Sequence, residues 1–451
     1  MKNILSLLLA ITGLLSHAQQ KRMTPELLWE LGRVSLEDVS DDGQKFIYGV
    51  TRYDVDKNKG NRDLYLMNTD GGGILQLTNM EGNEHSAHFL RNDELIGFGH
   101  NNQFHIINVD GSNKRAVTEI EGGIHNIKAY DLPDGRIALI STKSIKLEKT
   151  TSDLYPDLSK ANVRIIDDLM YRHWDTWSDA SYEHVGIAYI DKDLEATTAW
   201  KDLMTGEKFD VPVQPFGGSG AFCLSPDGRT LVYESKKLSG LEWAVSTNSQ
   251  LYKVDVKTGE TKMITEGMAG YDKHPVYSPD GSKLAWLSMR TKGYESDVND
   301  LVIMDLKSGQ KMHVLVAADK YDDYTFHSFV WADENQIFAG VPLNGSNQVF
   351  EIALPKKISK DAEVSLEQVS SGQHNYNHFE VAGKNSLLVD RQDMNHATEV
   401  YHLSTRNGKV RQLTTVNNEI YGNLATGKVE AREVTTTDGK EMLTWDIPSR
   451  L

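Results

Sequence analysis

The sequence predicts an all-β protein, a β-propeller of about seven blades, because two short motifs recur in a fixed order. The first is a Ser-Pro-Asp-Gly turn followed by an apolar strand, clearest at Leu224–Tyr233 and Tyr277–Trp286 and weaker at Val39–Tyr48 and Leu132–Leu139. Proline presets φ at the first corner, aspartate bonds the backbone just downstream, and glycine supplies the positive φ that closes the turn.

The second motif is a strand, a tight polar turn and a further strand that ends in Gln-Leu-Thr or close to it. Its copies end at Gln76–Thr78, Ala116–Thr118, Met263–Thr265 and Gln412–Thr414. A four-stranded unit that recurs at roughly 50 residues is typical of propeller blades. The alternative is an unrelated series of β-hairpins, which would not repeat two motifs in the same order.

The blades follow one another along the chain. We expect them at Val34 to Thr78, Ala87 to Thr118, from Ile127 with an interruption after Thr142, from Phe222, from Val276, from near Phe329, and from near Phe379 to Thr414. Six or eight blades stay open, because blades three and six are irregular. A short helix precedes blade one at Thr24–Leu31, with Thr24 as its N-cap and Pro25 in its first turn.

Blade three carries an insertion at about residues 143–180, which is its least propeller-like part. The spacing of Val163, Ile166, Leu169 and Met170 predicts a helix from Ser159 to about Arg172 with one apolar face. Insertions in repeat proteins often form the binding face. The helix would lead into the stretch His173-Trp174-Asp175-Thr176-Trp177.

The composition of the chain limits the cellular compartment and the binding partners that we expect. The 451 residues carry a formal net charge of -16, which argues against a nucleic-acid partner. Residues 1–18 have the pattern of a signal peptide, with Lys2, a short apolar run and a small-residue cleavage site, although a transmembrane anchor is the alternative. No later segment is apolar enough to span a membrane. The lone Cys223 excludes an intrachain disulfide and is expected to be a buried small hydrophobe. We therefore expect a periplasmic or secreted protein.

The C-terminal segment changes character. We assign residues 19–428 to the propeller, whereas residues 429–451 read as a strand, a turn at Asp438-Gly439 and a strand that does not repeat the blade pattern. This hairpin has the form of the opening strands of another domain, and we expect it to be a truncated start of that domain.

Several stretches of the chain resemble the non-catalytic part of prolyl oligopeptidase family serine peptidases, most closely the type 5 dipeptidyl peptidases of the bacterial periplasm. The resemblance rests on Leu27–Val34, Asp153–Leu158, Arg164–Trp177, Gly267–Asp272, Gly293–Asp297 and Thr437–Trp445. It implies a propeller that restricts access and binds the free amino terminus of the substrate, joined to an α/β-hydrolase domain that releases dipeptides. Thr437–Trp445 would be the first hairpin of that domain.

The chain departs from this family in the catalytic machinery. It contains no Gly-x-Ser-x-Gly elbow, and Gly217–Ala221 has the wrong spacing. Histidines such as His88 and His274 cannot be assembled into a triad without a nucleophile. We expect no catalytic residue, cofactor or metal in this chain, and no hydrolysis by the chain alone. A separately encoded α/β-hydrolase domain would be a partner. The alternative function is a stand-alone TolB-like periplasmic propeller that binds peptide or protein without catalysis.

Four residues are candidates for substrate binding. The α-ammonium of a peptide requires a desolvated carboxylate or an aromatic face. Asp175, with Trp174 and Trp177 beside it, offers both, and Glu84 lies in the connection between blades one and two. The competing interpretations are an ordered loop in which the indoles pack, and a solvated loop acid. Glu295 is a weaker candidate.

Overall fold

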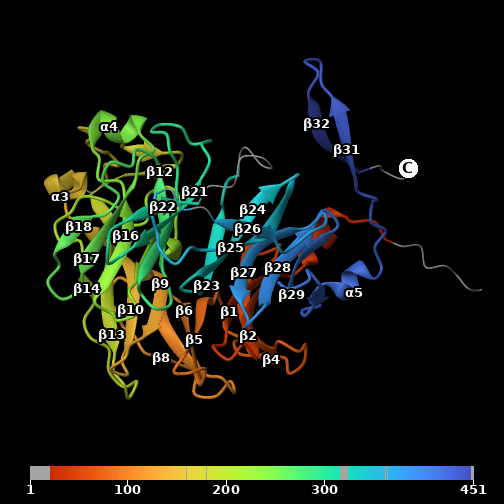
Figure 1. Cartoon of the computed structure of the whole chain (residues 1–451). Helices are drawn as coiled ribbons and strands as arrows, with labels where there is room; N and C mark the ends of the chain where they lie inside the picture. The colour runs from red at the N-terminus through yellow and green to blue at the C-terminus, as the bar shows by residue number, and fades with distance from the viewer. Residues whose placement is uncertain are drawn as a thin grey trace, which may run out of the picture.

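Seven four-stranded antiparallel sheets form the blades of a β-propeller in the computed structural model, which describes residues 21–158, 160–178, 180–314, 324–360, 362 and 364–447 (Figure 1). The predicted all-β propeller with seven blades is therefore confirmed. The signal peptide proposed for residues 1–18 lies outside the described residues.

Each blade takes its strands in chain order, and only blade three has other strands between them. Blades one to three contain β1 Arg33–Val39, β2 Lys45–Asp54, β3 Lys59–Asn68, β4 Leu75–Gln76; β5 His85–Leu90, β6 Leu95–His100, β7 Gln103–Asn108, β8 Arg115–Ala116; and β9 His125–Asp131, β10 Ile137–Lys146, β13 Ser181–Ile190, β14 Lys201–Asp202.

The later blades follow the same plan. Blades four to seven contain β15 Phe222–Leu224, β16 Thr230–Ser235, β17 Gln250–Asp255, β18 Thr261–Met263; β19 Asp272–Tyr277, β20 Lys283–Ser288, β21 Asp300–Asp305, β22 Lys311–His313; β23 Ser328–Asp333, β24 Gln336–Leu343, β25 Ser346–Ala353, β26 Ser365–Gln368; and β27 Asn375–Val381, β28 Ser386–Asp393, β29 His396–Ser404, β30 Val410–Gln412.

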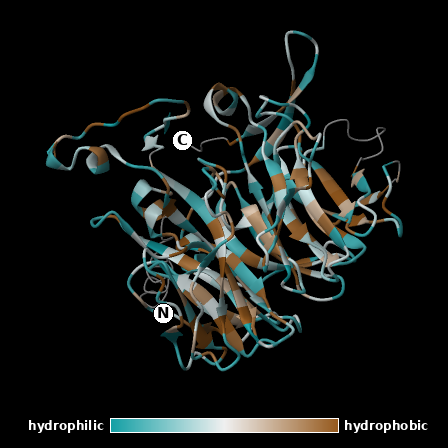
Figure 2. Ribbon diagram, turned by 90° about the vertical axis from the view of Figure 1, so that its left-hand side faces the viewer, coloured by the Kyte–Doolittle hydropathy of each residue, from teal (hydrophilic) through white to brown (hydrophobic). Residues whose placement is uncertain are grey.

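The first strand of each blade is the innermost one. Contacts between β1 and β5, β5 and β9, β15 and β19, β23 and β27, and β27 and β1 join the first strands of neighbouring blades around the axis. The hydrophobic core lies between the faces of adjacent blades, where the strands are mostly apolar (Figure 2). Cys223, on β15, is buried in one of these layers, as predicted.

Side-chain bonds to the backbone explain the Ser-Pro-Asp-Gly motif. Ser278 Oγ donates to Asp280 Oδ1 at 2.7 Å and accepts from the Lys283 N–H at 2.9 Å. Asp280 Oδ1 also accepts from the Ser282 N–H at 3.0 Å. The same bonds recur at Ser225 and Ser40. The motif repeats because each copy fastens the first strand of a blade to the second.

The Gln-Leu-Thr motif has a similar cause. Thr265 Oγ1 accepts from the Leu251 N–H at 3.0 Å and donates to Gln250 Oε1 at 2.7 Å. Equivalent pairs of bonds are made by Thr118, Ser370 and Thr414. The hydroxyl thus ties the end of the fourth strand to the start of the third.

We expect Thr265→Val to lower the free energy of unfolding by about 1–3 kcal/mol, because the buried Leu251 N–H and the half-buried Gln250 amide oxygen both lose their partner while the side-chain volume is kept. Chemical denaturation monitored by circular dichroism measures the change. Thr437→Val, at an exposed turn of the C-terminal hairpin, is the matched control and should be close to neutral. Equal midpoints for the two variants would contradict this role of the motif.

Carboxylates connect neighbouring blades near the axis. Glu37 Oε2 accepts from the Ala87 N–H at 3.1 Å, and Glu234 Oε2 accepts from the His274 N–H at 3.0 Å. Asp390, on blade seven, accepts from the Leu36 N–H at 2.9 Å and so closes the ring onto blade one. An acid on one blade thereby satisfies the free inner edge of the next first strand.

The connections between the second and third strands of the blades define one face of the propeller, here called the upper face. It carries the described residues of 147–158, 160–178 and 180, helix α4 (Gly240–Val245), residues 289–299 and the turn at Asn344-Gly345. The hairpin of β31 (Glu430–Thr435) and β32 (Glu441–Asp446) stands above this face in Figure 1. Trp445 lies so close to Gly345 that an added Cβ would come within 2.6 Å of its Nε1.

The predicted helix from Ser159 to Arg172 is wrong for the described residues. The insertion contains α3 (Thr151–Leu154), the 3₁₀ turn η1 (Pro156–Leu158) and extended chain up to β11 (Arg172–His173), while Ser159 itself lies outside the described residues. Val163, Ile166 and Leu169 are 57%, 44% and 41% exposed. No other element covers the apolar face that would have stabilised the helix, and β-branched residues in this stretch disfavour it.

The remaining helices are short. α2 (Pro25–Glu30) is capped by Thr24, whose Oγ1 accepts from the Leu27 N–H at 3.3 Å, as predicted. α5 (Asn418–Tyr421) lies between blade seven and the C-terminal hairpin. Within the part of the chain that the structure describes, no helix is both long and apolar enough to cross a bilayer.

Candidate functional site on the upper face

The insertion ends in a small hairpin that presents three of the four predicted site residues together. β11 pairs with β12 (Thr176–Trp177), so that Arg172 is opposite Trp177 and Trp174-Asp175 form the tip. Trp174 has a φ of +51° and is 68% exposed. The Asp175 carboxylate is also exposed. The hairpin therefore displays an acid and an indole to solvent above the propeller.

Two arginines lie against the ring of Trp177, the second tryptophan of this hairpin. The guanidinium groups of Arg164 and Arg172 lie 4.6 Å and 5.2 Å from the centre of the Trp177 ring. Arg172 Nε also donates to the Trp174 carbonyl at 2.5 Å. Trp177 thus already makes cation–π contacts within the protein, and Asp175 and Trp174 are the groups left for an incoming ammonium.

Trp174 has an aromatic neighbour from another connection. Its ring meets Phe216 edge to face at 5.5 Å, and Phe216 is itself largely exposed. The insertion around them extends from the upper face as an arm with a run of hydrophobic residues (Figure 2). The exposed large apolar residues of this arm are Leu154, Tyr155, Leu158, Val163, Ile165, Ile166, Leu169 and Tyr171. An apolar surface of this kind marks an interaction site.

The structure does not bring Glu84 to this site. Glu84 is fully buried between blades one and two, where its Oε2 accepts from the Thr78 hydroxyl at 2.7 Å and its Oε1 lies 2.9 Å from His100 Nδ1. Its N–H donates to the Arg62 carbonyl, just as that of Asp272, at the equivalent position before blade five, donates to the Ser249 carbonyl. Glu84 therefore occupies a structural position of the blade repeat.

The buried carboxyl of Glu84 gives a pH-dependent stability. Burial raises its pKa from 4.5 to about 7. The raised pKa stabilises the neutral form, so this contribution is complete below pH 4.5 and is lost as the pH rises through 7. Between pH 5 and 8 the loss is on the order of 3 kcal/mol. We expect Glu84→Gln to be less sensitive to this pH change than the wild type in denaturant titrations, whereas exposed Glu81→Gln should follow the wild type. Parallel curves for all three would contradict a buried titration at Glu84.

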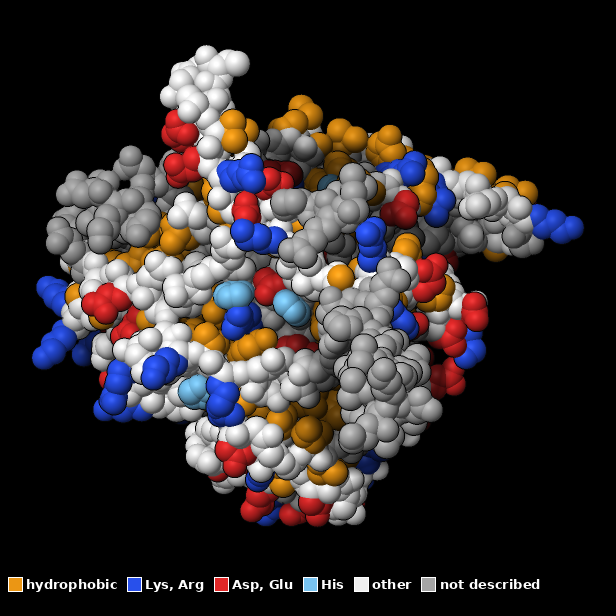
Figure 3. Space-filling view, turned by 90° about the vertical axis from the view of Figure 1, so that its right-hand side faces the viewer, with side chains coloured by type: hydrophobic (Ala, Val, Ile, Leu, Met, Phe, Trp, Pro, Cys, Tyr) orange, Lys and Arg blue, Asp and Glu red, His pale blue; other side chains and the backbone are white. Residues whose placement is uncertain are grey.

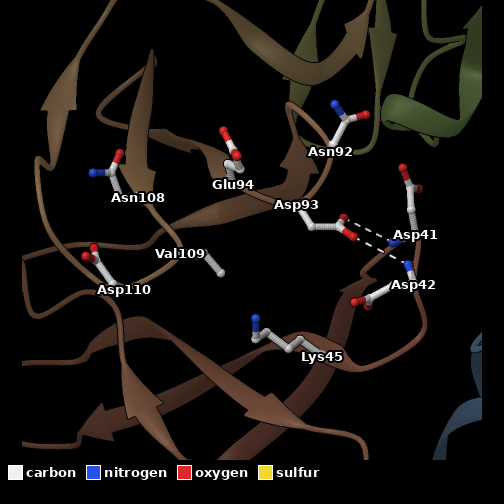
Figure 4. Close-up of a pocket in the computed structure, with 9 residues that line it drawn as sticks. All are labelled: Asp41, Asp42, Lys45, Asn92, Asp93, Glu94, Asn108, Val109 and Asp110. Carbon is white, nitrogen blue, oxygen red and sulfur yellow. Dashed lines mark hydrogen bonds between the residues drawn. The ribbon is translucent and has the colours of Figure 1, made fainter.

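The opposite face holds an acidic cavity of about 830 Å³. Figure 4 shows how the Asp93 carboxylate accepts from the N–H groups of Asp41 and Asp42, at 3.0 Å and 3.4 Å. Lys45 reaches into the same space. Across the described ranges, no three His, Cys, Asp or Glu side chains converge as a metal ion would require. The cavity lies between turns that close blades one and two.

The weaker candidate Glu295 lies on the upper face near α4. Burial lowers the pKa of Lys236 to about 8, and the charge of Glu295 acts in the opposite direction. The Lys236 ammonium lies 3.9 Å from the centre of the Trp243 ring. Gly293, two residues before Glu295, donates to Thr247 Oγ1 at 3.1 Å and holds this loop against the next one.

Ionisable residues on the innermost strands were missed at the sequence level. His88, Lys128, His274 and His378 lie on four different first strands and meet near the axis. The available signal was the presence of charged residues in segments that otherwise read as apolar strands.

The chain is similar to known peptidases over nearly its whole length. It is 37% identical over 432 residues to dipeptidyl-peptidase 5 of Porphyromonas gingivalis, covering 95% of this chain and 60% of that protein. The chain thus spans about three fifths of the length of this curated relative. No family model matches the chain.

Solved structures agree on the fold. An acylaminoacyl peptidase in complex with Z-Gly-Gly-Phe-chloromethyl ketone superposes with a TM-score of 0.68 at 15% identity, covering 96% of this chain and 60% of that one. The β-propeller domain of the trilobed protease from Pyrococcus furiosus, described as having an open velcro topology, gives a TM-score of 0.53 at 13% identity and covers 87% of this chain and 98% of that one. The chain is thus similar in sequence to dipeptidyl-peptidase 5 over nearly its whole length, and its structural neighbours are prolyl oligopeptidase family peptidases with propeller domains.

Proposed function

We propose that this chain is the propeller part of an exported serine exopeptidase that releases dipeptides from the free amino termini of peptides. The similarity to dipeptidyl-peptidase 5 over 95% of the chain carries the proposal. The composition of residues 1–18 supports export to the periplasm or beyond. Because the chain spans 60% of that relative, hydrolysis would depend on a region that corresponds to the rest of it.

The upper face is the proposed docking surface for an α/β-hydrolase region, in the same polypeptide or in a separate one. The apolar arm and the β31–β32 hairpin both lie there. Hydrophobic side chains gather along the upper edge of the molecule in Figure 3. Val434, Met442 and Leu443 of the hairpin are exposed, as strands that await further sheet partners would be.

Asp175 is the proposed partner of the α-ammonium of the substrate. It lies at a hairpin tip on the proposed docking face, with Trp174 beside it as an aromatic surface. A docked domain would remove this tip from water, and the ion pair would strengthen as the surroundings become less polar. The other peptide end would then extend toward the nucleophile of the hydrolase region, and cleavage would proceed through an acyl-enzyme.

A fusion tests the proposal. The chain is joined in frame to the region of the Porphyromonas gingivalis relative that it does not cover, and dipeptide release is measured by mass spectrometry. We expect release from a peptide with a free amino terminus and none from the N-acetylated peptide. Asp175→Asn should raise KM about tenfold with little change in kcat, since it removes an interaction of roughly 1.4 kcal/mol or more with the ammonium.

The control for this variant is Asp157→Asn, an exposed acid elsewhere on the insertion. A fusion that binds peptide but releases no dipeptide would overturn the peptidase assignment and favour a propeller that binds without catalysis. Equal KM values for the two variants would instead overturn only the role of Asp175.

A further inference from the structure

A cleft lies between the C-terminal hairpin and the propeller at blade six, apart from the insertion that carries Asp175. It encloses about 430 Å³, a volume in the range of small-molecule sites. Asn344, Ser346 and Gln373 line it on the propeller side, and Glu433 and Trp445 line it on the hairpin side. This space is called the hairpin cleft below.

The hairpin presents one face to this cleft. Glu433 of β31 is opposite Leu443 of β32, and Ala431 is opposite Trp445, so these alternating residues of the two strands share a side of the sheet. All four line the cleft. The unpaired strand edges lie beside this face and not in it. A ligand in the cleft therefore meets side chains, and it does not meet the free edge that an added peptide strand would need.

Bonds within the protein fix both walls of the hairpin cleft. Gln348, on the propeller side, is 2% exposed, and its Nε2 donates to the carbonyls of Gly372 and His374 at 3.0 Å and 3.1 Å. Asn395 Nδ2 donates to the Gly427 carbonyl at 2.9 Å, shortly before the hairpin begins. The cleft is therefore formed before any ligand arrives.

Polar groups that line the hairpin cleft lack partners. Ser346 is only 8% exposed, yet among the described residues its hydroxyl takes part in no hydrogen bond. The side-chain amides of Asn344 and Gln373 make none either within the part of the chain that the structure describes. A polar group that is enclosed without a partner is costly, and in native proteins it calls for an explanation. A ligand with several hydroxyl groups would provide the missing bonds.

The charge of the hairpin cleft excludes anions. None of the described residues that line it is a lysine, an arginine or a histidine. Glu433 is its charged residue and has no ion-pair partner in the described ranges, because the adjacent Arg432 pairs with Glu430 and Asp446 at 3.1 Å and 3.0 Å. A carboxylate can accept from two neighbouring hydroxyl groups at once. The cleft thus favours a ligand that is rich in donors and has no negative charge.

We propose that the hairpin cleft binds a short neutral saccharide. A sugar ring has an apolar face of C–H groups, which would lie on the Trp445 indole, and a rim of hydroxyl groups that both donate and accept. Glu433 would accept from two adjacent hydroxyl groups, and Ser346, Asn344 and Gln373 would bond to the others. This inference goes beyond the proposed function, because dipeptide release takes no part in it.

Calorimetric titration of the unmodified chain tests the inference, with cellobiose and N,N′-diacetylchitobiose as saccharide probes. Putrescine and N-acetyl-Ala-Ala-amide represent the competing occupants, a cation and a neutral peptide. We expect at least one disaccharide to bind at least tenfold more tightly than putrescine and the peptide. No heat with either disaccharide up to about 10 mM, tenfold above a Kd of about 1 mM, overturns the inference. Tighter binding of putrescine or of the peptide also overturns it.

Two substitutions test the recognition by side chains. Ser346→Ala and Glu433→Gln should each weaken disaccharide binding about tenfold. Ser346→Ala should leave the melting temperature unchanged, because its hydroxyl has no partner in the described part of the protein. Ser365→Ala and Glu367→Gln, at exposed positions of β26 in the same blade, are the matched controls and should bind as the wild type does. Equal affinities for all four variants contradict the assigned contacts.

NMR of the indole N–H groups locates the ligand. Trp445→Phe removes one of the eight indole resonances of the chain and thereby assigns it. The disaccharide should shift this resonance and leave that of Trp174, on the insertion, unchanged. A shift at Trp174 without one at Trp445 would place the saccharide at the insertion and would overturn the assignment to the hairpin cleft.

Discussion

Replacing Trp286 with alanine should lower the free energy of unfolding by about 4 kcal/mol, since removal of a fully buried indole combines lost apolar burial with a cavity. Trp286 lies on β20 and is 0% exposed. It packs in the layer between blades four and five with Cys223 and Val232. The layer is formed by two sheets on a fixed backbone, so it can close around the missing ring only in part.

A polar consequence adds to this loss. Trp286 Nε1 donates to Asp272 Oδ1 at 3.1 Å, and Asp272 is itself fully buried. Burial raises the pKa of Asp272 to about 6 and outweighs the side-chain hydrogen bonds, that of Trp286 among them, which favour its charged form. Removing the indole N–H leaves this carboxyl with one donor fewer, so the destabilisation should be larger at pH 8 than at pH 5.

Urea denaturation followed by circular dichroism measures the effect. Trp286→Phe keeps most of the ring and should cost less than the alanine variant. Trp174→Ala, the same change at a side chain that is 68% exposed, should stay within about 0.5 kcal/mol of the wild type. A loss below 1 kcal/mol for Trp286→Ala would mean that the blades can slide together and refill the layer.

The blades could be predicted from the sequence because their defining interactions are local. The hydroxyls of Ser278 and Thr265 bond to groups within the same blade, 5 to 15 residues away. Such bonds require a particular residue at a particular spacing, and this requirement leaves a visible repeat. The short helix at Pro25–Glu30 followed from the same kind of local signal, a capping threonine before a proline.

The insertion shows where local patterns mislead. Apolar residues at Val163, Ile166 and Leu169 have helical spacing, yet a helix of this length needs a partner surface for its apolar face. Within the described residues nothing covers it, and the chain is extended there. The spacing of these residues reflects an exposed apolar arm rather than the face of a packed helix.

The candidate site was predictable only where its residues are adjacent in the chain. Trp174, Asp175 and Trp177 come together because one tight hairpin holds them. The enclosure of Glu84 depends on Thr78 and on His100 of the next strand pair, which the sequence does not place beside it. The ionisable residues His88, Lys128, His274 and His378 lie on the first strands of four blades and come together only when the ring closes, so no window of sequence contains them.

The closure of the ring between blade seven and blade one should depend strongly on the side-chain amide of Asn417. Asn417→Ala is expected to lower the free energy of unfolding by about 3 kcal/mol, because two buried backbone groups lose their partners at once. Asn417 Oδ1 accepts from the Gly32 N–H at 2.8 Å, and its Nδ2 donates to the Gly32 carbonyl at 3.0 Å. Asn417 follows blade seven and Gly32 precedes blade one, so this pair joins the two ends of the propeller.

The neighbouring Asn418 supplies the matched control, since it is exposed and begins the same short helix. Asn417 makes no side-chain capping bond to α5, so its loss does not act through that helix. Asn417→Asp should give an intermediate loss, because it keeps the acceptor for Gly32 N–H and removes the donor. If Asn417→Ala and Asn418→Ala unfold at the same denaturant concentration, the Asn417 amide is dispensable for ring closure. The ring would then be closed by the hydrogen bond of Asp390 and by the apolar cluster that contains Leu36 of β1 and Val400 of blade seven.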